Sequence, residues 1–342
     1  MSTNEKKVLK VFVTGDWDAD GVIATALIVY GQEKMGKYPF EANAIVTKVP
    51  LDPDRTKYFL SDFSGGYDVV VFLDIPYNEI LGNIMKMLKE HFGVSKIVFI
   101  DHHITSLQRI DEVKTHADEV LVDYRKPTSM LVYEELVKRG ITVHQRLRSF
   151  VEVVKYMDMG KRVPKEYMKL FEITKMFSKV LTAIRDVELW VKIVDWLASP
   201  TPLPVPLDDA VWNRVKKVIE ERDKEVAEKA MELAIGAVRI GDFRFVDARN
   251  AWKKRGVTAL ASKLSTILKA PVALLAGTNR DYSLLILKAS YGRAYRIAKY
   301  LVGEGVALDI AGHPNLAIVR LPKDINRQEL IEHLYKAVYY TS

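Results

Sequence analysis

Short apolar runs alternate with segments of helical periodicity over the first 125 residues of the chain. The apolar runs are rich in Val, Ile, Leu and Phe on both faces, which is typical of strands in a parallel sheet covered by helices. They lie at residues 7–16, 42–49, 67–74, 95–101 and 118–123. Helical spacing between them predicts helices over 21–35, 78–91 and 129–138. Strands that alternate with helices in this way predict an α/β fold with an open, doubly wound parallel sheet.

The pattern changes after residue 140, and residues 140–198 are expected to be mostly helical. The stretch "SPTPLPVPL", residues 199–207, has four prolines in nine positions and predicts an extended connector. A long amphipathic helix with aspartates at its start is expected over 208–234, and from about residue 237 strands and helices alternate again. We therefore predict a larger α/β domain at 1–198, a linker with a connecting helix at 199–236, and a smaller α/β domain at 237–342.

The stretch "GDWDADG", residues 15–21, places three aspartates at alternate positions before a glycine. A calcium-binding EF-hand would need a glutamate at position 12 of the loop, where this chain has Leu27, and a helix in place of the apolar strand that precedes the motif. A haloacid-dehalogenase-like phosphatase also has Asp-x-Asp after its first strand, with the first aspartate as nucleophile. That alternative does not explain the acidic residues at later strand ends.

Three predicted strands of the first domain end in acid. The carboxylates and imidazoles at these ends are Asp16, Asp18, Asp20, Asp74, Asp101, His102 and His103. Ligands collect at the carboxyl edge of an open parallel sheet, so neighbouring strands would bring these groups together. Such a cluster repels itself unless cations lie in it, and oxygen ligands with a few imidazoles and no sulfur favour Mn²⁺ or Mg²⁺. Two such ions that share a carboxylate are the usual arrangement for hydrolysing phosphate esters.

Each of these residues also has a simpler interpretation. Asp20 could serve only as the N-cap of a helix, Asp74 could only end a strand, and His102 could be a satisfied core histidine. Three such coincidences would have to fall on one edge of one sheet, so we favour the metal cluster.

Composition narrows the class of protein further. The chain has 342 residues and no cysteine, which excludes disulfides, zinc–thiolate sites and cysteine nucleophiles. We expect a cytoplasmic protein without a membrane span, because no run approaches about eighteen apolar residues and "MSTNEKK" leads directly into a strand. The net charge of +7 fits either a solvated surface or a polyanionic partner.

The motifs "GDWDADG", "VVVFLD", "FIDHH" and "KYMDMG" together resemble the four motifs of the DHH-family phosphoesterases. The resemblance implies two metal ions bound by Asp16, Asp18, Asp20, Asp74, His102 and Asp158, with Asp74 as the bridge. It also implies that His103 contacts the scissile phosphate and that Asp101 orients a histidine. Many members begin with His-x-x-x-Asp-x-Asp, whereas this chain has Thr14 in place of that histidine and adds Asp16, which is similar to the RecJ-type variant.

The second domain is similar to the DHH-associated substrate domain through "AGHPNLA", residues 311–317. His313 would reach a substrate phosphate, and Gly312 would allow close approach of the backbone. Ala311 replaces a glycine of the family motif, and Leu316 and Ile318 replace small residues. The upstream residues that could contact phosphate are Lys288, Ser290, Arg293 and Arg296, although a solvated helix face explains the two arginines equally well.

The resemblance implies a Mn²⁺-dependent exonuclease, with Mg²⁺ as the other candidate ion, that releases nucleoside monophosphates from single-stranded DNA or short RNA. We expect the chain to lack the additional OB-type domain of long bacterial RecJ proteins, which would favour shorter substrates. Alternatives with the same chemistry are a nanoRNase and a phosphohydrolase for cyclic dinucleotides or 3′-phosphoadenosine 5′-phosphate. A RecJ-like replisome scaffold is a non-enzymatic alternative, replication and repair proteins are expected partners, and a homo-oligomer is compatible with the sequence.

Overall fold

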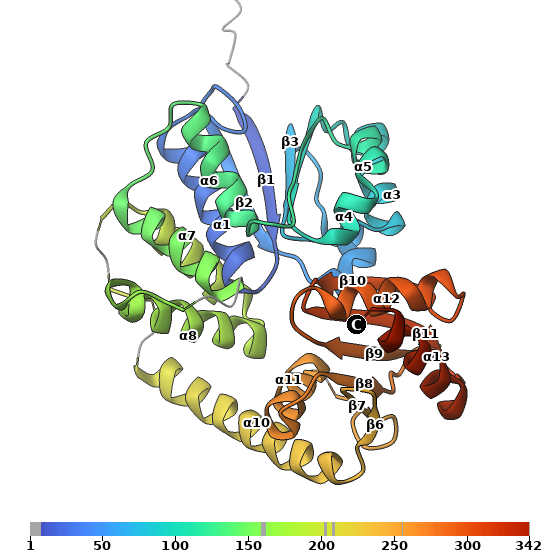
Figure 1. Ribbon diagram of the computed structural model, residues 1–342. Helices are drawn as coiled ribbons and strands as arrows, with labels where there is room; N and C mark the ends of the chain where they lie inside the picture. The colour runs from blue at the N-terminus through green and yellow to red at the C-terminus, as the bar shows by residue number, and fades with distance from the viewer. Residues whose placement is uncertain (1–7, 159–161, 202–203, 207–208, 255, 342) are drawn as a thin grey trace, which may run out of the picture. The chain divides into compact units, whose positions relative to one another are not determined.

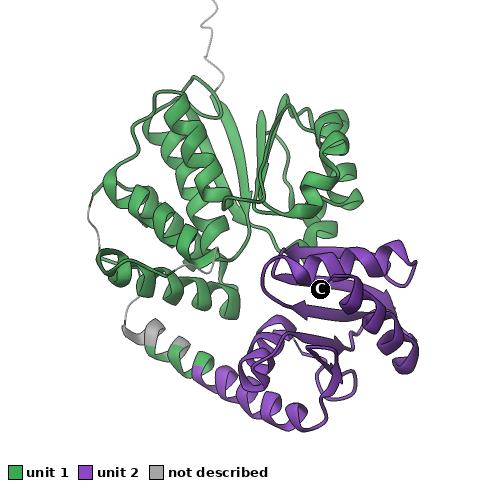
Figure 2. Ribbon diagram, in the orientation of Figure 1, with its two compact units in different colours: residues 1–219 green, residues 220–342 purple. Residues whose placement is uncertain are grey.

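The computed structural model describes residues 8–158, 162–201, 204–206, 209–254 and 256–341. Residues 202, 203 and 207 of the predicted connector and residues 159 and 160 of the fourth motif lie outside this part of the chain. The contacts divide the chain into two compact units, residues 1–219 and 220–342, which Figure 2 distinguishes by colour. The division falls within a long helix, α10 (Asp209–Ile235), and the limits of the three predicted segments remain a prediction.

The first unit is built on a five-stranded parallel sheet of order β2-β1-β3-β4-β5 (Figure 1). Its strands are β1 (Leu9–Gly15), β2 (Ala44–Pro50), β3 (Val69–Leu73), β4 (Lys96–Asp101) and β5 (Glu119–Val122). This confirms the predicted parallel sheet. The chain passes from β1 to one side for β2 and to the other side for β3, so the topological switch point lies between β1 and β3, where open α/β sheets bind ligands.

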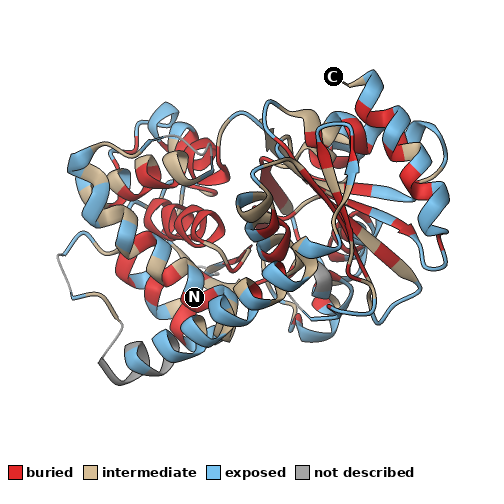
Figure 3. Ribbon diagram, turned by 60° about the horizontal axis from the view of Figure 1, so that its bottom comes forward, coloured by how far each residue is buried: buried red, intermediate tan, exposed pale blue. Residues whose placement is uncertain are grey.

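Alternate residues of the strands face two separate cores. Val11, Val13 and Val71 pack in a core with α1 (Ala19–Val29), α6 (Thr128–Lys138), α7 (Gln145–Asp158), α8 (Met168–Ile184) and α9 (Val187–Ala198). Phe12 and Phe72 face the other core, with α2 (Phe59–Asp62), α3 (Glu79–Phe92) and α5 (Ile110–His116). Buried residues run along strands in Figure 3. Burial on both faces explains why the strands read as nearly continuous apolar runs.

One local prediction for this unit needs correction, and two short helices were missed. The first helix was expected at 21–35, but α1 begins at Ala19 because Asp18, not Asp20, is its N-cap, and its last turn widens into a π-helix, η1 (Tyr30–Lys34). Helices α4 (Ile104–Gln108) and α5 were not predicted from the sequence. They have five and seven residues, which is too short to show a clear helical period.

The second unit has a six-stranded mixed sheet of order β10-β11-β9-β8-β7-β6, in which only β7 and β8 pair in parallel. The strands are β6 (Val238–Ile240), β7 (Phe243–Asp247), β8 (Val272–Ala276), β9 (Tyr282–Lys288), β10 (Asp309–His313) and β11 (Leu316–Pro322). One face packs on α10 and α11 (Val257–Leu268), and the other on α12 (Arg293–Gly303) and α13 (Arg327–Tyr340). This confirms the second α/β unit. Among the described helices of both units, none combines the length and apolarity needed to span a bilayer.

Candidate metal centre

The first motif lies at the junction of β1 and α1. The Asp18 carboxylate accepts hydrogen bonds from the backbone N–H groups of Asp20 and Gly21, at 2.9 and 3.1 Å, and so begins the helix. Asp16 precedes it and accepts a hydrogen bond from the N–H of Trp17 at 2.7 Å. A Cβ atom on Gly21 would lie 2.5 Å from the backbone nitrogen of Asp16. The glycine that ends the motif is therefore required by the close approach of these two turns of backbone.

Asp20 is buried between two helix starts. It lies in the first turn of α1, and its two carboxylate oxygens accept hydrogen bonds from the N–H groups of Thr128 and Ser129, at 2.7 and 2.8 Å. These two groups are at the N-terminus of α6, where unpaired N–H groups and the helix dipole favour an anion. The N-terminus of α6 therefore fixes the position of the Asp20 carboxylate without the help of a cation.

Asp74 follows β3 in the left-handed backbone conformation, with φ of 60°. Its N–H donates to the carbonyl of Ile100 at 3.0 Å, and the Thr128 hydroxyl donates to its Oδ1 at 3.0 Å. A residue other than glycine in this conformation costs energy, and such strain tends to accumulate at functional sites. The strained turn leaves the Asp74 side chain buried at the switch point, 2% exposed.

Asp101 is fully buried at the end of β4 and is the anchor of His103. Its Oδ1 lies 2.7 Å from Nδ1 of His103, and its Oδ2 accepts hydrogen bonds from the Ser106 hydroxyl and, at 3.2 Å, from the His103 N–H. Burial by itself would raise the pKa of Asp101, but His103, then His102 and the Ser106 hydroxyl, lower it to about 2. Asp101 is therefore an ionised carboxylate that holds one ring nitrogen of His103.

His102 lies at the centre of the remaining acids. Its Nε2 is 3.3 Å from Oδ1 of Asp74 and 3.9 Å from Oδ2 of Asp20, and its Nδ1 is 3.4 Å from Oδ2 of Asp158. Asp158 is the last residue of α7, and its side chain is 30% exposed. The fourth motif, far along the sequence, is thus brought to the same edge of the sheet as the other three.

The ligand atoms form two adjacent groups in this unit. In each group the candidate atoms lie within 4.8 Å of one another: one consists of Asp20, His102 and Asp158, and the other of Asp74, Asp101 and His103. Asp74 contacts His102 as well, so its carboxylate lies between the two groups. Asp16 and Asp18 belong to neither group, but both lie beside the cluster: Asp18 raises the pKa of Asp74 and of Asp158, and the His103 imidazole opposes the rise in the pKa of Asp16.

The cluster concentrates negative charge away from water. Burial, followed by neighbouring aspartates, raises the pKa of Asp16 and of Asp158 to about 7 and raises the pKa of Asp20 and Asp74. Burial lowers the pKa of His102, but Asp74 and the other acids outweigh it and raise it well above the usual value. Carboxylate oxygens and imidazole nitrogens without sulfur are the ligands that suit Mn²⁺ and Mg²⁺, so the donor set fits divalent ions.

We expect the metal-free protein to lose stability as the pH rises from about 4 to about 7. A carboxyl whose pKa is higher in the folded state binds more protons when folded, so the free energy of unfolding falls between its unfolded pKa of 3.8 and the folded value of about 7 for Asp16 and Asp158. Thermal unfolding in EDTA across this range measures the effect. Mn²⁺ should reduce the fall because it binds the folded state, and Asp16→Asn should flatten it. A melting temperature that rises with pH in EDTA would contradict the expected charge repulsion.

Several residues around the cluster were missed from the sequence. Thr128, Ser129 and Ser106 hold the acids in place, and "PTS" before an apolar helical run was a signal for a helix start that could bind a carboxylate. Arg185 ends α8 in the left-handed conformation, pairs with the buried Asp52 after β2, and opposes the rise in the pKa of Asp16. Nothing in the local sequence of Arg185 or Asp52 indicates that they meet.

The predicted phosphate-binding residues of the second unit lie around the end of its sheet. His313 and Lys288 both pair in register with Leu316, so they flank β11 from opposite sides. Gly312 has a φ of 101°, and a Cβ there would lie 2.4 Å from the Leu316 carbonyl oxygen. Ser290 lies in the loop between β9 and α12. Leu316 and Ile318, which depart from the family motif, pack on the core beneath α11.

The two arginines of α12 make structural contacts. The Arg293 guanidinium pairs with Asp242 and donates to the carbonyl of Val338 at 3.2 Å. Arg296 donates to the carbonyls of Tyr291 and Thr341, at 2.9 and 3.5 Å. Both side chains thus satisfy carbonyl groups at the end of α13, which favours the structural interpretation of these residues over direct phosphate binding.

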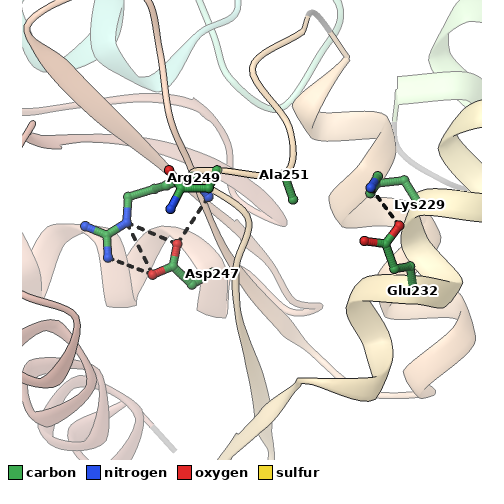
Figure 4. Close-up of a pocket in the computed structure, with 6 residues that line it drawn as sticks. Lys229, Glu232, Asp247, Arg249 and Ala251 are labelled. Atoms are coloured by element: carbon green, nitrogen blue, oxygen red, sulfur yellow. Dashed lines mark hydrogen bonds and ion pairs between the residues drawn. The ribbon is translucent and has the colours of Figure 1, made fainter.

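An open pocket in the second unit lies apart from these residues. Figure 4 shows its lining residues: Lys229, Glu232, Asp247, Arg249, Asn250 and Ala251. Asp247 pairs with Arg249 at 2.7 Å, and Lys229 pairs with Glu232. Because these charges neutralise each other in pairs, the pocket offers no net charge for a ligand.

Comparison with known proteins identifies the family. A model of the DHH family, N-terminal domain, matches residues 10–182, which is half of the chain. The chain therefore belongs to the DHH family, as the four motifs predicted. No protein in a comparison with curated sequences matches it.

Solved structures share the fold over nearly the whole chain. The DHH domain of a member of a ribosomal-protein family is 18% identical with a TM-score of 0.63, over 96% of this chain and 86% of that one. RecJ from Thermus thermophilus, in complex with Mn²⁺, is 15% identical with a TM-score of 0.59, over 97% of this chain and 52% of that one. The pGpG-specific phosphodiesterase PggH from Vibrio cholerae is 11% identical with a TM-score of 0.51, over 98% and 100%. The RecJ-like fold is thereby confirmed, and this chain spans about half of the Thermus RecJ chain.

Proposed function

We propose that this protein is a metal-dependent phosphodiesterase that removes nucleotides from the end of single-stranded DNA or short RNA. The observation that carries the proposal is the convergence of Asp20, Asp74, His102 and Asp158 at the β1–β3 switch point, where His102 lies within 4 Å of all three carboxylates. Membership of the DHH family and the RecJ-like fold support a hydrolase acting on phosphodiester bonds.

The ligands that we propose for two divalent ions are Asp16, Asp18, Asp20, Asp74, His102 and Asp158. When bound, such ions lower the pKa of a water molecule and neutralise charge on the phosphoryl oxygens. Asp74 would contribute to both positions because it lies between the groups, and Asp20 would keep its geometry through the N-terminus of α6. The buried acids would lose their protons as the ions bind, because metal ligands must be ionised.

His103 is the residue that we propose contacts the scissile phosphate. The buried Asp101 carboxylate holds its Nδ1, so a substrate phosphate would be contacted through Nε2. Burial lowers the pKa of His103, but Asp101 outweighs it and raises the pKa above the usual value. The imidazolium form can therefore donate a hydrogen bond to a phosphoryl oxygen and stabilise the charge that develops there.

Manganese is the ion that we propose, with magnesium as the alternative. The mixture of carboxylates with His102 is softer than an all-oxygen site, which favours Mn²⁺ over Mg²⁺. The Thermus RecJ structure with a similar fold contains Mn²⁺. In the second unit, His313, Gly312, Lys288, Ser290 and Arg293 remain the proposed substrate contacts, with Arg293 weakened by its pairing with Asp242.

A dinucleotide phosphodiesterase is the second candidate. PggH, whose name specifies pGpG, has a similar fold over all of its length, whereas this chain covers only half of the Thermus RecJ. The same cluster would serve either substrate, and nanoRNase, cyclic-dinucleotide and 3′-phosphoadenosine 5′-phosphate activities belong to this alternative. A replisome scaffold is less favoured, because the full set of acidic and imidazole residues is present.

End-labelled oligonucleotides decide between these functions. DNA and RNA oligomers labelled at the 5′ or the 3′ end, linear and cyclic dinucleotides, and 3′-phosphoadenosine 5′-phosphate are each incubated with Mn²⁺, Mg²⁺ or EDTA. We expect mononucleotides from the oligomers with Mn²⁺ and none with EDTA. Turnover of the dinucleotides alone would support the second candidate, and no turnover of any substrate with either metal would contradict both.

A further inference from the structure

Three tyrosines of the second unit contact one another at the surface where α12 meets α13. The rings of Tyr300 and Tyr340 are stacked, with centroids 5.7 Å apart and planes at 23°. Tyr339 meets Tyr340 edge to face at 5.6 Å. Tyr339 and Tyr340 are 78% and 70% exposed, so most of both rings is in water.

These rings are not needed to attach α13 to the sheet. The helix buries Leu330, Leu334 and Val338, which belong to the core of this unit, whereas the two tyrosines form its exposed last turn. Adjacent exposed rings at a helix end form an apolar patch of the kind that marks a binding surface.

Basic side chains accompany the rings on both helices. On α12, Lys299 directly precedes Tyr300 in the sequence and is exposed, and on α13 Lys336 lies one turn before Tyr339 and Tyr340. Residues 291–304 and 335–341 contain four basic side chains and one acidic one, Glu304. One of the four, Arg293, is paired with Asp242. Since Arg293 and Arg296 also satisfy carbonyls at the end of α13, the negative end of that helix is covered.

We propose that this tyrosine patch, made of Tyr300, Tyr339, Tyr340, Lys299 and Lys336, binds single-stranded nucleic acid outside the catalytic cluster. Exposed aromatic rings stack on unpaired bases whatever their sequence, and neighbouring cations bind the phosphates. The proposal rests on an oligonucleotide substrate and extends it: long strands gain a contact that a dinucleotide lacks.

A second copy of this chain is a poorer occupant of the patch. A two-fold dimer brings the same surface of both subunits together, so the charges of Lys299 and Lys336 would lie against an equally basic surface of the partner. Within the described part of the chain neither lysine forms an ion pair that would neutralise it. A polyanion removes this repulsion, whereas a second copy increases it.

Binding of a labelled oligonucleotide tests the patch. Fluorescence anisotropy with oligo(dT) of about 20 nucleotides is measured in the full-length Asp74→Asn background, so that the strand is not hydrolysed. We expect Tyr339→Ala/Tyr340→Ala, and separately Lys299→Ala/Lys336→Ala, to weaken binding about tenfold or more. Tyr335→Ala is the matched control, because Tyr335 is exposed on the same helix but its hydroxyl is bonded to the backbone of β6.

The catalytic assay separates this proposal from the proposed function. With Asp74 intact, the Tyr339→Ala/Tyr340→Ala substitutions should slow digestion of the long strand. They should leave turnover of a 5′-phosphorylated dinucleotide unchanged. If the double tyrosine and double lysine variants both bind and digest the long strand as the wild type does, the proposed binding role of the patch is wrong. The proposed nuclease function is not affected by that result. If wild type hydrolyses no oligonucleotide, the proposed function fails, whatever the binding result. A change from dimer to monomer by light scattering, with binding unaltered, would show that the patch joins two copies and would also overturn the proposal.

Discussion

Asp74→Asn is expected to abolish phosphodiester hydrolysis while the fold remains intact. Asp74 lies between the two ligand groups, so its replacement weakens both proposed metal positions at once. Loss of several kcal/mol of metal-derived stabilisation corresponds to a decrease of about 10³-fold or more in the rate. The measurement is turnover of a labelled oligonucleotide at saturating Mn²⁺, alongside thermal unfolding in EDTA.

The fold should tolerate this substitution because asparagine keeps the shape and the acceptor oxygen for the Thr128 hydroxyl. It also removes a buried carboxyl whose pKa burial raises well above the usual value, so the melting temperature in EDTA at pH 8 should not fall. Asp111→Asn, an exposed acid on α5, is the matched control and should leave the rate unchanged. Normal turnover of Asp74→Asn with added Mn²⁺ would show that the cluster is not the catalytic centre.

Asp101→Asn is expected to lower kcat by about 10²- to 10⁴-fold with a smaller change in KM. Asparagine cannot supply two acceptor oxygens, so its amide would face either the His103 ring nitrogen or the Ser106 hydroxyl. The imidazole would then lose its fixed orientation and its pKa would fall, because the carboxylate that raises it is gone.

The pH profile distinguishes this positioning role from simple loss of stability. The basic limb of the kcat profile should move to lower pH in Asp101→Asn, because His103 loses its proton earlier. Ser106→Ala keeps the carboxylate and removes one of its hydrogen bonds, so it should cause a smaller loss of about tenfold. Asp62→Asn, an exposed acid on α2, is the control. An unchanged pH profile in Asp101→Asn would contradict the assigned role of His103.

The sheet could be predicted from the sequence because its strands are apolar on both faces and end in acid. The register of β1, β3 and β4 then places Asp16, Asp74 and Asp101 at one edge, which local patterns alone could indicate. Asp18 as the helix cap was missed because Asp20, two residues later, has the same preference for a helix start. Either aspartate could cap α1. Asp20 instead binds the N-terminus of α6, more than a hundred residues away, and Asp18 is the cap.

The surroundings of the cluster depend on contacts between distant segments. Arg185 meets Asp52 because the end of α8 lies beside the loop after β2, and no periodicity in either segment encodes that. Likewise, Arg293 and Arg296 were candidates for phosphate contacts, but the structure pairs them with Asp242 and with carbonyls at the end of α13. The sequence shows that these two residues are arginines, but their partners can be identified only from the fold.

The most direct test of the account is a crystal of the wild-type protein soaked in Mn²⁺ and measured at the manganese absorption edge. We expect two anomalous peaks at the carboxyl edge of the first sheet, with the Asp74 carboxylate in contact with both ions. Asp20, His102 and Asp158 should surround one of the two ions. If no anomalous density appears at the carboxyl ends of these strands, or if the ions bind without contact to Asp74, the two-metal centre is contradicted.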